Sequence, residues 1–378
     1  MKDLAVYIHI PFCDKKCYYC DFTSFSGLDK RIEEYIEYLL LEMDLYRETL
    51  KEYNIKTIFL GGGTPSYIDG SYIVKIIRTL FEKYNCSLVE EITIEANPGT
   101  LDREKLMQYR EAGVNRISLG VQTLNDQLLK SIGRLHTAAE AIENIKLIRE
   151  LGFSNINVDL MFGLPDQTVA DCISTLEEIV DLGVEHISYY SLILEEKTMM
   201  NRWFEEGKIR LPDEDVERDM YHEGVNFLKS RGYEHYEISN FCKPGYQCKH
   251  NLFYWTLKPY IGFGISSHSN IEGKRFCNYN TFKDYFDSID RSKVPVLEVE
   301  DIDSHMEMAE YVIMGLRLIG GINKEDFKGR FGRALEDVYG KVIDSSMRAG
   351  LLVDDGTYVR FTDKGLDLSN MVYVDILP

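Results

Sequence analysis

Positive charge is scarce in this 378-residue sequence, which has 43 lysine and arginine residues against 62 aspartate and glutamate residues and a formal charge of −19 at pH 7. Nucleic-acid binding depends on clustered lysine and arginine side chains that neutralise phosphates. The sequence therefore excludes nucleic acid as an expected partner.

Long apolar runs are also absent. No segment approaches the ~20 apolar residues that a membrane-spanning helix needs. The N-terminus has no basic segment followed by a long apolar stretch and a small-residue cleavage site. These absences predict a cytoplasmic protein whose thiols stay reduced. The length and a hydrophobic share of 44% predict a globular chain of two or three domains.

Three of the eight cysteines, Cys13, Cys17 and Cys20, stand in one short segment directly after an apolar run, residues 4–10. In a reducing compartment such a group indicates metal or cluster ligation rather than disulfides. A structural zinc site commonly has four protein ligands. An iron–sulfur cluster held by three cysteines leaves one iron free to bind a small molecule. The spacing favours the cluster and leaves zinc as the alternative.

Apolar β-rich runs alternate with amphipathic helical patterns over the first 235 residues. Six successive strand–helix units predict a parallel sheet with right-handed crossovers. The fold class is therefore α/β, and we expect a barrel or partial barrel. The expected strands are residues 4–10, 56–60, 91–95, 116–122, 156–163 and 186–194, and the expected helices are 29–50, 72–84, 101–112, 124–151, 168–182 and 213–230.

Polar residues and glycines fall at or near the carboxyl ends of these strands. Besides the cysteine segment, they are residues 61–64, Glu95, Gln122 and Asp159. Each also has a purely structural interpretation, such as a helix cap, a tight turn or a loop hydrogen bond. Barrel folds carry their chemistry at the carboxyl ends of the strands, so the agreement of five strand ends on one face favours a functional site.

The sequence divides into three expected domains, a core at residues 1–235, an aromatic-rich extension at 236–300 and a C-terminal domain at 301–378. The extension contains His250-Asn251-Leu252-Phe253-Tyr254-Trp255. Aromatic rings suit a flat apolar ligand, and His250 could give a metal a nitrogen ligand. A hydrogen-bonded histidine in an aromatic core, or zinc bound with Cys242 and Cys248, are the alternatives.

The acidic segment 294–303 predicts a linker before the C-terminal domain. Helices up to residue 348 and a hairpin turning at Asp355-Gly356 then predict a winged-helix-like module. Its acidity favours packing or protein interaction over DNA binding.

Together these motifs resemble the radical S-adenosylmethionine (SAM) superfamily, whose hallmark is the Cys-x3-Cys-x2-Cys segment. More narrowly, the sequence is similar to the HemN/HemW group over nearly its whole length. The matching segments are Tyr7 and His9, residues 61–65, 95–98, 120–122, 133–136 and 159–165, and the C-terminal region. The resemblance implies a partial (β/α)6 barrel followed by a small C-terminal domain.

The resemblance also implies the cofactors. A [4Fe-4S] cluster would be held by Cys13, Cys17 and Cys20, and its open iron would bind the amino and carboxylate groups of one SAM, whose reductive cleavage gives a 5′-deoxyadenosyl radical. The implied SAM contacts come from the backbone of Gly62, Gly63 and Thr64, from Glu95 on the ammonium, Arg134 on the carboxylate, Gln122 and Asp159 on other polar groups, Tyr19 near the adenine and Tyr7 on the sulfonium side.

Position 22 distinguishes the branches of this group. Oxygen-independent coproporphyrinogen III oxidases, the HemN branch, carry a further cysteine two positions after the third cluster cysteine, whereas this chain has Phe22. The HemW branch also has a His-Asn-x-x-Tyr-Trp motif, found here at residues 250–255. The resemblance thus implies a haem chaperone that binds haem through His250 and passes it to respiratory cytochromes at the membrane surface. The alternative is oxidative decarboxylation of coproporphyrinogen III to protoporphyrinogen IX.

Overall fold

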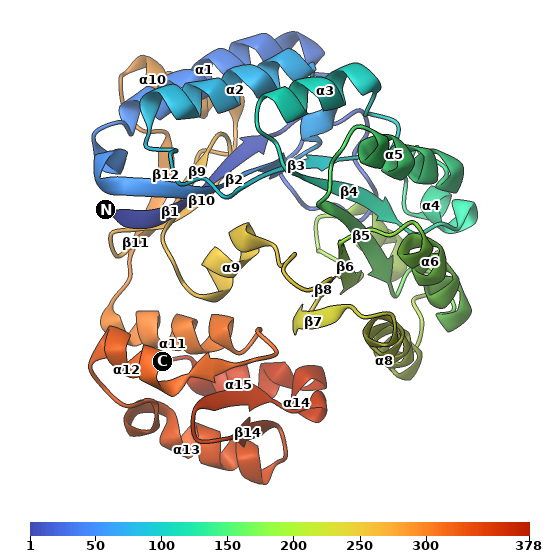
Figure 1. Cartoon of the computed structure of the whole chain (residues 1–378), viewed down its shortest axis with the longest axis vertical. Coiled ribbons are helices and arrows are strands. Elements are labelled where there is room, and N and C mark those ends of the chain that lie inside the picture. The colour runs from blue at the N-terminus through green and yellow to red at the C-terminus, as the bar shows by residue number, and fades with distance from the viewer.

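The computed structural model describes residues 1–378 and contains a large mixed sheet, helices on the outer side of that sheet, and a small C-terminal domain (Figure 1). The strands of the large sheet are β1 (Lys2–Ile10), β2 (Tyr53–Gly62), β3 (Glu91–Ala96), β4 (Arg116–Gln122), β5 (Ile156–Phe162), β6 (His186–Ser191), β7 (Glu234–Glu237), β8 (Asn240–Cys242), β9 (Tyr260–Phe263), β10 (His268–Ile271), β11 (Lys274–Asn278) and β12 (Val296–Asp301).

The helices around this sheet are α1 (Ile32–Leu45), α2 (Gly70–Lys83), α3 (Arg103–Glu111), α4 (Asp126–Ser131), α5 (Ala138–Glu150), α6 (Val169–Asp181), α7 (Met199–Glu205), α8 (Glu214–Ser230), α9 (Lys249–Trp255) and α10 (Phe282–Asp290). Single 3-10 turns occupy Asp29–Arg31, Thr49–Glu52 and Pro65–Tyr67. No helix of the chain is both long and apolar enough to cross a membrane.

The strand order is β12-β11-β10-β9-β1-β2-β3-β4-β5-β6-β8-β7. Strands β1 to β6 are parallel, and β9 adds a further parallel strand to β1. Because β12 and β7 form opposite edges, the sheet stays open. The predicted α/β fold, a partial barrel of six strand–helix units, is confirmed.

Local sequence signals fix the helix boundaries. Helices α5 and α6 begin with capping boxes, in which Thr137 pairs with Glu140 and Thr168 with Asp171. The turn from α5 to β5 uses Gly152 at φ +84°, a left-handed conformation that favours glycine. The inward faces of the helices and the sheet share one core of 59 buried residues. The caps and the glycine turn are local signals, which explains why the helices could be predicted from the sequence.

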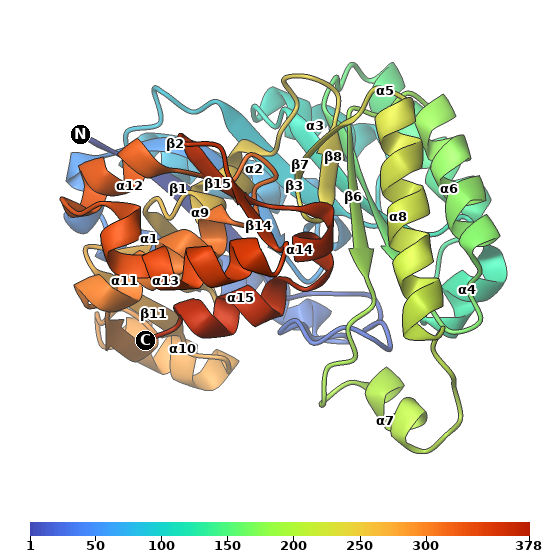
Figure 2. The same ribbon diagram turned by 90° about the horizontal axis from the view of Figure 1, so that it is seen from below.

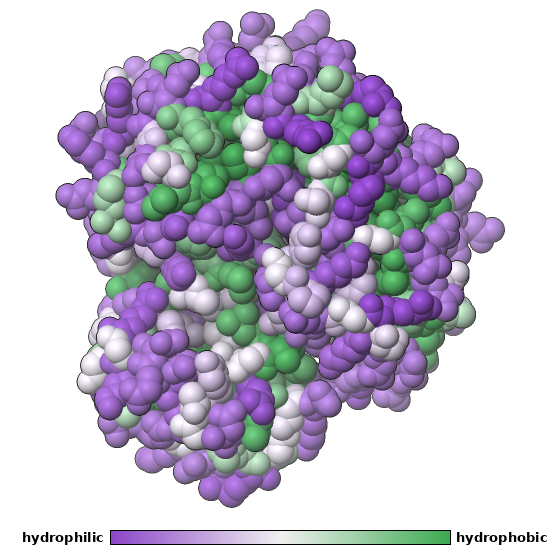
Figure 3. All heavy atoms as spheres, viewed as in Figure 1, coloured by the Kyte–Doolittle hydropathy of each residue, from purple (hydrophilic) through white to green (hydrophobic).

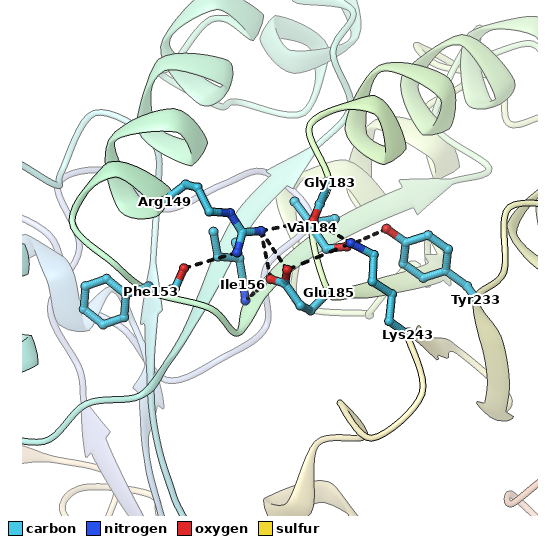
Figure 4. Close-up of polar contacts among 8 residues, drawn as sticks. All are labelled: Arg149, Phe153, Ile156, Gly183, Val184, Glu185, Tyr233 and Lys243. Carbon is cyan, nitrogen blue, oxygen red and sulfur yellow. Dashed lines mark hydrogen bonds and ion pairs between the residues drawn. The ribbon is translucent and has the colours of Figure 1, made fainter.

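The amino-terminal ends of β5 and β6 are joined by a polar cluster around Glu185 (Figure 4). Its carboxylate pairs with Arg149 at 2.9 Å and accepts the backbone N–H of Ile156 at 3.1 Å. Lys243, which follows β8, lies 3.9 Å from the same carboxylate and donates to Gly183 O at 2.7 Å. The cluster ties α5, β5, β6 and the β8 region together at the end of the barrel opposite the cysteine segment.

Residues 236–300 contribute to the main sheet rather than forming a separate layer, since β8 pairs with β6 and β9 pairs with β1. The expected linker at 294–303 is wrong, because this segment forms β12, an edge strand antiparallel to β11. Its side chains are mostly exposed and acidic, a composition that discourages edge-to-edge pairing. The sequence pattern missed the strand because neither of its faces is buried.

The C-terminal domain contains α11 (Ser304–Gly315), β13 (Ile322–Asn323), α12 (Lys324–Phe331), α13 (Leu335–Arg348), β14 (Leu352–Asp354), β15 (Tyr358–Phe361), α14 (Asp363–Asp367) and α15 (Ser369–Ile376). The predicted hairpin is confirmed as β14–β15, and β13 completes a three-stranded sheet. A separate core of 14 buried residues holds the domain together.

The C-terminal domain packs against β7 and α9, and α7 stands off from the body on another side (Figure 2). Ile319 N donates to Tyr236 O and Ile238 N to Arg317 O, both at 3.1 Å. The Arg317 guanidinium also lies 4.4 Å from the ring centre of Trp255. Apolar side chains gather along this boundary on an otherwise largely hydrophilic face (Figure 3).

Candidate cofactor site

The three clustered cysteines lie in the loop that follows β1. Cys13 is buried, Cys17 and Cys20 are half-buried, and all three are free thiols. Cys13 N donates to Phe25 O at 3.0 Å, and Phe25 N donates to Pro11 O at 2.7 Å. The loop is thereby closed on itself, and its thiols are held at the carboxyl end of the strand.

The arrangement of the thiols suits a cluster better than a single metal ion. No three His, Cys, Asp or Glu side chains of the chain converge tightly enough to hold one ion, as the zinc alternatives at Cys13 and at Cys248 would require. A cubane cluster spreads its thiolates around a whole iron–sulfur core. Burial raises the pKa of Cys20 to about 11, so the thiolate form requires a cationic partner such as iron.

The glycine loop after β2 packs directly against the cysteine loop. Gly63 N donates to Ile10 O at 2.9 Å, and Thr64 N donates to Phe12 O at 2.8 Å. A Cβ atom at Gly63 would lie 2.7 Å from Phe12 O. The glycine is therefore needed for the close approach of the two backbones, and Thr64 Oγ1 comes within 3.3 Å of Cys13 Sγ.

A cavity of about 150 Å³ opens beside these two loops. It brings together every predicted cluster and SAM residue except Tyr7. The predicted residues that line it are Cys13, Cys17, Tyr19, Cys20, Gly62, Gly63, Thr64, Glu95, Gln122, Arg134 and Asp159.

Glu95, at the end of β3, offers this cavity a carboxylate. Its Oε2 accepts the N–H of Gly62 at 3.1 Å. Burial, and then the negative charge of Asp159, raise the pKa of Glu95 to about 7. A carboxylate in this environment is stabilised by a cation, which matches the predicted contact with the ammonium of SAM.

Arg134 offers the complementary positive charge. Its guanidinium donates to Asn97 Oδ1 at 2.7 Å, and its buried Nε has no hydrogen-bond partner in the chain. A Cβ atom at Gly120 would lie 2.9 Å from this guanidinium. A buried donor without a partner is costly, and an anionic ligand group such as the SAM carboxylate would satisfy it.

Gln122 ends β4, and Asp159 lies in the middle of the neighbouring strand β5. Gln122 has φ +70°, an uncommon backbone conformation for a residue other than glycine, and its Oε1 accepts the Tyr190 hydroxyl at 2.9 Å. Asp159 accepts from Ser118 at 3.3 Å and from Asn157 at 2.7 Å. Both polar side chains are thus fixed in orientation before any ligand binds.

Asn97, Ser118 and Tyr190 are among the further lining residues that the sequence did not predict as site residues. Asn97 joins Arg134 to the glycine loop, since its Nδ2 donates to Thr64 Oγ1 at 2.9 Å. Ser118 precedes Gln122 by four residues on β4, so the period of two along a strand was the signal that could have identified it.

The two predicted tyrosines have different positions. Tyr19 lines the cavity, and burial raises the pKa of its hydroxyl despite the neighbouring Arg134. Tyr7 instead lines an adjoining cavity and bonds His9 Nδ1 at 3.0 Å. The residue shared by the two cavities is Phe22.

His250 is buried, and both of its ring nitrogens have partners. Nδ1 lies 2.9 Å from Thr57 Oγ1, and Nε2 lies 2.9 Å from the Tyr254 hydroxyl. Burial, and then the charge of Arg116, lower the pKa of His250 to about 3. As a haem ligand His250 stays a prediction, and ligation would require that one of these hydrogen bonds break.

Two family models match separate parts of the chain. Residues 7–179 match the Radical SAM superfamily, and residues 302–368 match the HemN C-terminal domain. The heme chaperone HemW of Lactococcus lactis is 36% identical over 376 residues, which are 100% of this chain and 98% of the relative. This chain belongs to the HemW family of radical SAM proteins. HemW of Escherichia coli is 34% identical over 367 residues, covering 97% of this chain and 96% of the relative.

Among solved structures, coproporphyrinogen III oxidase (HemN) from Escherichia coli superposes with a TM-score of 0.87, covering 99% of this chain and 90% of that chain at 22% identity. At that identity the likeness establishes the fold alone. Membership of the radical SAM superfamily gives the cofactors, a [4Fe-4S] cluster and SAM, and the thiols, the paired charges and the glycine loop described above fit both.

Proposed function

We propose that this chain binds haem next to its cluster and SAM, and delivers the haem to haem-accepting cytochromes. The observation that carries the proposal is a second cavity, of about 530 Å³, which adjoins the SAM cavity at Phe22. Its volume is in the range of small-molecule sites. Relatives named heme chaperone HemW that align with the full chain support haem as its occupant.

In this proposal the bound cluster and SAM supply one-electron chemistry, and the chain's residues position SAM. Glu95 accepts from the ammonium of SAM, and Arg134 donates to its carboxylate as a charge-assisted hydrogen bond. The N–H groups of Gly62, Gly63 and Thr64 are already engaged, so the glycine loop contributes carbonyl oxygens. The other assigned contacts are Gln122 and Asp159 with polar groups, Tyr19 with the adenine and Tyr7 with the sulfonium side.

The proposed recipients are respiratory cytochromes, which the chain would meet at the membrane surface from the cytoplasm. All eight cysteines of the chain are free, which suits a reducing compartment. A negative net charge of −19 favours recipients that present a basic surface.

The test is a pair of assays on one anaerobically reconstituted sample of the full chain. We expect a Soret band that saturates with added haem, loss of that band to an apocytochrome on mixing, and no protoporphyrinogen IX from coproporphyrinogen III with SAM and a reductant. Turnover of coproporphyrinogen III without haem binding would overturn the proposal in favour of the oxidase alternative.

A further inference from the structure

The cavity of about 530 Å³ lies along β1, β9, β10 and β11, on the side of β1 away from β2 (Figure 1). Four aromatic side chains contribute to its lining, namely Tyr7, Phe22, Tyr254 and Tyr260. The Tyr254 and Tyr260 rings meet edge to face at 4.7 Å. Such rings offer a flat apolar ligand large contact areas with specific geometry.

Three side chains with a histidine nitrogen or a cysteine sulfur line the same cavity, namely His9, His268 and Cys277. Both ring nitrogens of His9 already have partners, the Tyr7 hydroxyl and Thr23 O, which leaves His268 and Cys277. They are directly opposite each other on the antiparallel strands β10 and β11. The two-residue turn between these strands, Glu272-Gly273, has φ values of +56° and +75°, as in a type I′ hairpin. This turn fixes the register, so both side chains project from the same face as close cross-strand neighbours.

Both side chains are available to a ligand. His268 is exposed, and Cys277 is a half-buried free thiol. Partial desolvation of the ring, and then the charge of Arg275, lower the pKa of His268. The imidazole is therefore neutral at pH 7, which is the form that binds a metal.

We propose that this cavity is the haem site and that the imidazole of His268 binds the haem iron, with Cys277 as a neighbour on the same face of the porphyrin. This inference rests on the proposed haem-carrier function. A ligand at the exposed edge of a cavity lets a recipient protein replace it without unfolding the carrier. The buried His250 does not offer that access.

The same geometry gives His250 a positioning role. Its Nε2 is bonded to the hydroxyl of Tyr254, whose ring lines the cavity. Removing the imidazole frees this ring without touching the iron. Substitutions at His250 and His268 therefore both weaken haem binding, but only the His268 substitution changes the coordination of the iron.

The test is a haem titration of anaerobically reconstituted full chain, followed by optical and electron paramagnetic resonance spectra of the ferric haem complex. For His268→Ala we expect at least about tenfold weaker binding and an altered ferric spectrum, which added imidazole restores. For His250→Ala we expect weaker binding with the wild-type spectrum. His305→Ala, at another exposed histidine, is the matched control and should change neither.

Each contrary outcome has a separate meaning. A wild-type spectrum and affinity in His268→Ala overturn the ligand assignment. So does a changed spectrum in His250→Ala or Cys277→Ser with none in His268→Ala, because the ligand would then be the other residue. Absence of haem binding by the wild-type chain instead overturns the proposed function.

Discussion

At the scale of single residues, the environment of Glu95 has opposing effects on the ionisation of its carboxyl group. Burial and the charge of Asp159 disfavour its carboxylate, whereas the N–H of Gly62 favours it. An ammonium group in the cavity would stabilise the carboxylate and so favour the ionised form. The carboxyl is therefore poised to change its protonation when SAM binds.

Replacing Glu95 with Gln should weaken SAM binding. The substitution keeps the acceptor for Gly62 N–H but removes the negative charge, and hydrogen bonds to charged groups contribute about 1.5–3 kcal/mol. We expect roughly 10- to 100-fold weaker binding, measured by calorimetry on cluster-replete protein. An unchanged affinity at equal iron content would contradict the assignment.

The same carboxyl should make SAM affinity depend on pH. The pKa of Glu95 in the free protein is about 7, and only the ionised form attracts an ammonium. Affinity should therefore fall by up to about tenfold per unit as the pH drops below 7. Glu95→Gln is the control, because the dependence should disappear with the carboxyl; a dependence that persists in this variant would assign it to another group.

Gly63 should tolerate no side chain. A Cβ atom there would lie 2.7 Å from Phe12 O and 2.8 Å from Ile10 O, and backbone oxygens cannot rotate away. We expect Gly63→Ala to cost about 1–3 kcal/mol of stability and to lower the iron content after reconstitution, because the cysteine loop shifts. Gly320→Ala, with nothing within 4 Å of its Cβ position, is the control. Equal iron content in both variants would contradict the expectation.

Glu95, Gln122 and Asp159 could be predicted because each lies in a short apolar strand, and parallel strands bring their carboxyl ends to one edge. Arg134 follows α4 rather than a strand, so only the family resemblance identified it. Asn97 and Tyr190 could not be singled out, since their roles depend on partners 37 and 68 residues away in the chain, Arg134 and Gln122. For His250 the sequence offered a hydrogen-bonded core histidine as one alternative but could not decide for it, because its partner Thr57 comes from the distant strand β2.

At the scale of elements, the polar cluster at Glu185 should stabilise the barrel without serving the site (Figure 4). In Glu185→Ala the half-buried Arg149 loses its partner and the N–H of Ile156 loses its acceptor. We expect a loss of about 2–4 kcal/mol in the free energy of unfolding, measured by urea denaturation, with SAM affinity preserved. The cluster lies at the ends of β5 and β6 remote from the cysteine loop.

Glu150→Ala is the matched control for this prediction. Its pair with Arg103 is short, at 2.6 Å, but both side chains are more than half exposed. Exposed ion pairs contribute about 0–1 kcal/mol, so this variant should remain close to the wild type. Equal losses in the two variants would show that burial at Glu185 has no energetic effect.

Elements with one buried face were predictable, and elements that depend on distant partners were not. Helices α5 and α6 carry their own caps and an apolar stripe. Strand β12 carries almost no buried side chain and is held by its backbone pairing with β11. The hairpin β10–β11 faces the second cavity only because β9 pairs with β1. The paired residues are about 250 positions apart in the chain, so no local sequence pattern could predict this pairing.

At the scale of the whole molecule, the open sheet places two cavities side by side. The SAM cavity occupies the carboxyl ends of the parallel strands, as in other barrels. The larger cavity uses the strands added beyond β1, which a closed barrel would not have. One fold therefore offers a cofactor site and a separate site for a larger ligand, joined at Phe22.

The stability of the molecule should fall on mild acidification because of its buried histidines. Burial holds the pKa of four of them at about 3 to 4 and lowers that of a fifth, so they stay neutral in the folded chain. In the unfolded chain they take up protons near pH 6.5. The unfolded state then binds more protons, and stability declines as the pH drops below about 6.5. These residues are His9, His136, His235, His250 and His186.

Three buried carboxyls act in the opposite direction. Burial raises the pKa of Glu42 and that of Glu95 to about 7, and it also raises the pKa of Glu237, so the folded state takes up protons there first and gains stability on acidification. Each histidine lowers the free energy of unfolding by about 2 kcal/mol at pH 5, and each carboxyl raises it by a similar amount. Because five histidines outnumber three carboxyls, a net loss of a few kcal/mol remains.

Urea denaturation of SAM-free, cluster-replete protein between pH 7.5 and pH 5 measures this net loss. We expect the denaturation midpoint to fall steadily over that range. In His235→Gln the slope of unfolding free energy against pH should correspond to about one proton fewer. This histidine suits the test because its ring stacks on Phe241, with 4.3 Å between the ring centres, and lines neither cavity. A midpoint that rises on acidification would show that the buried carboxyls, rather than the histidines, govern the stability of the fold in this pH range.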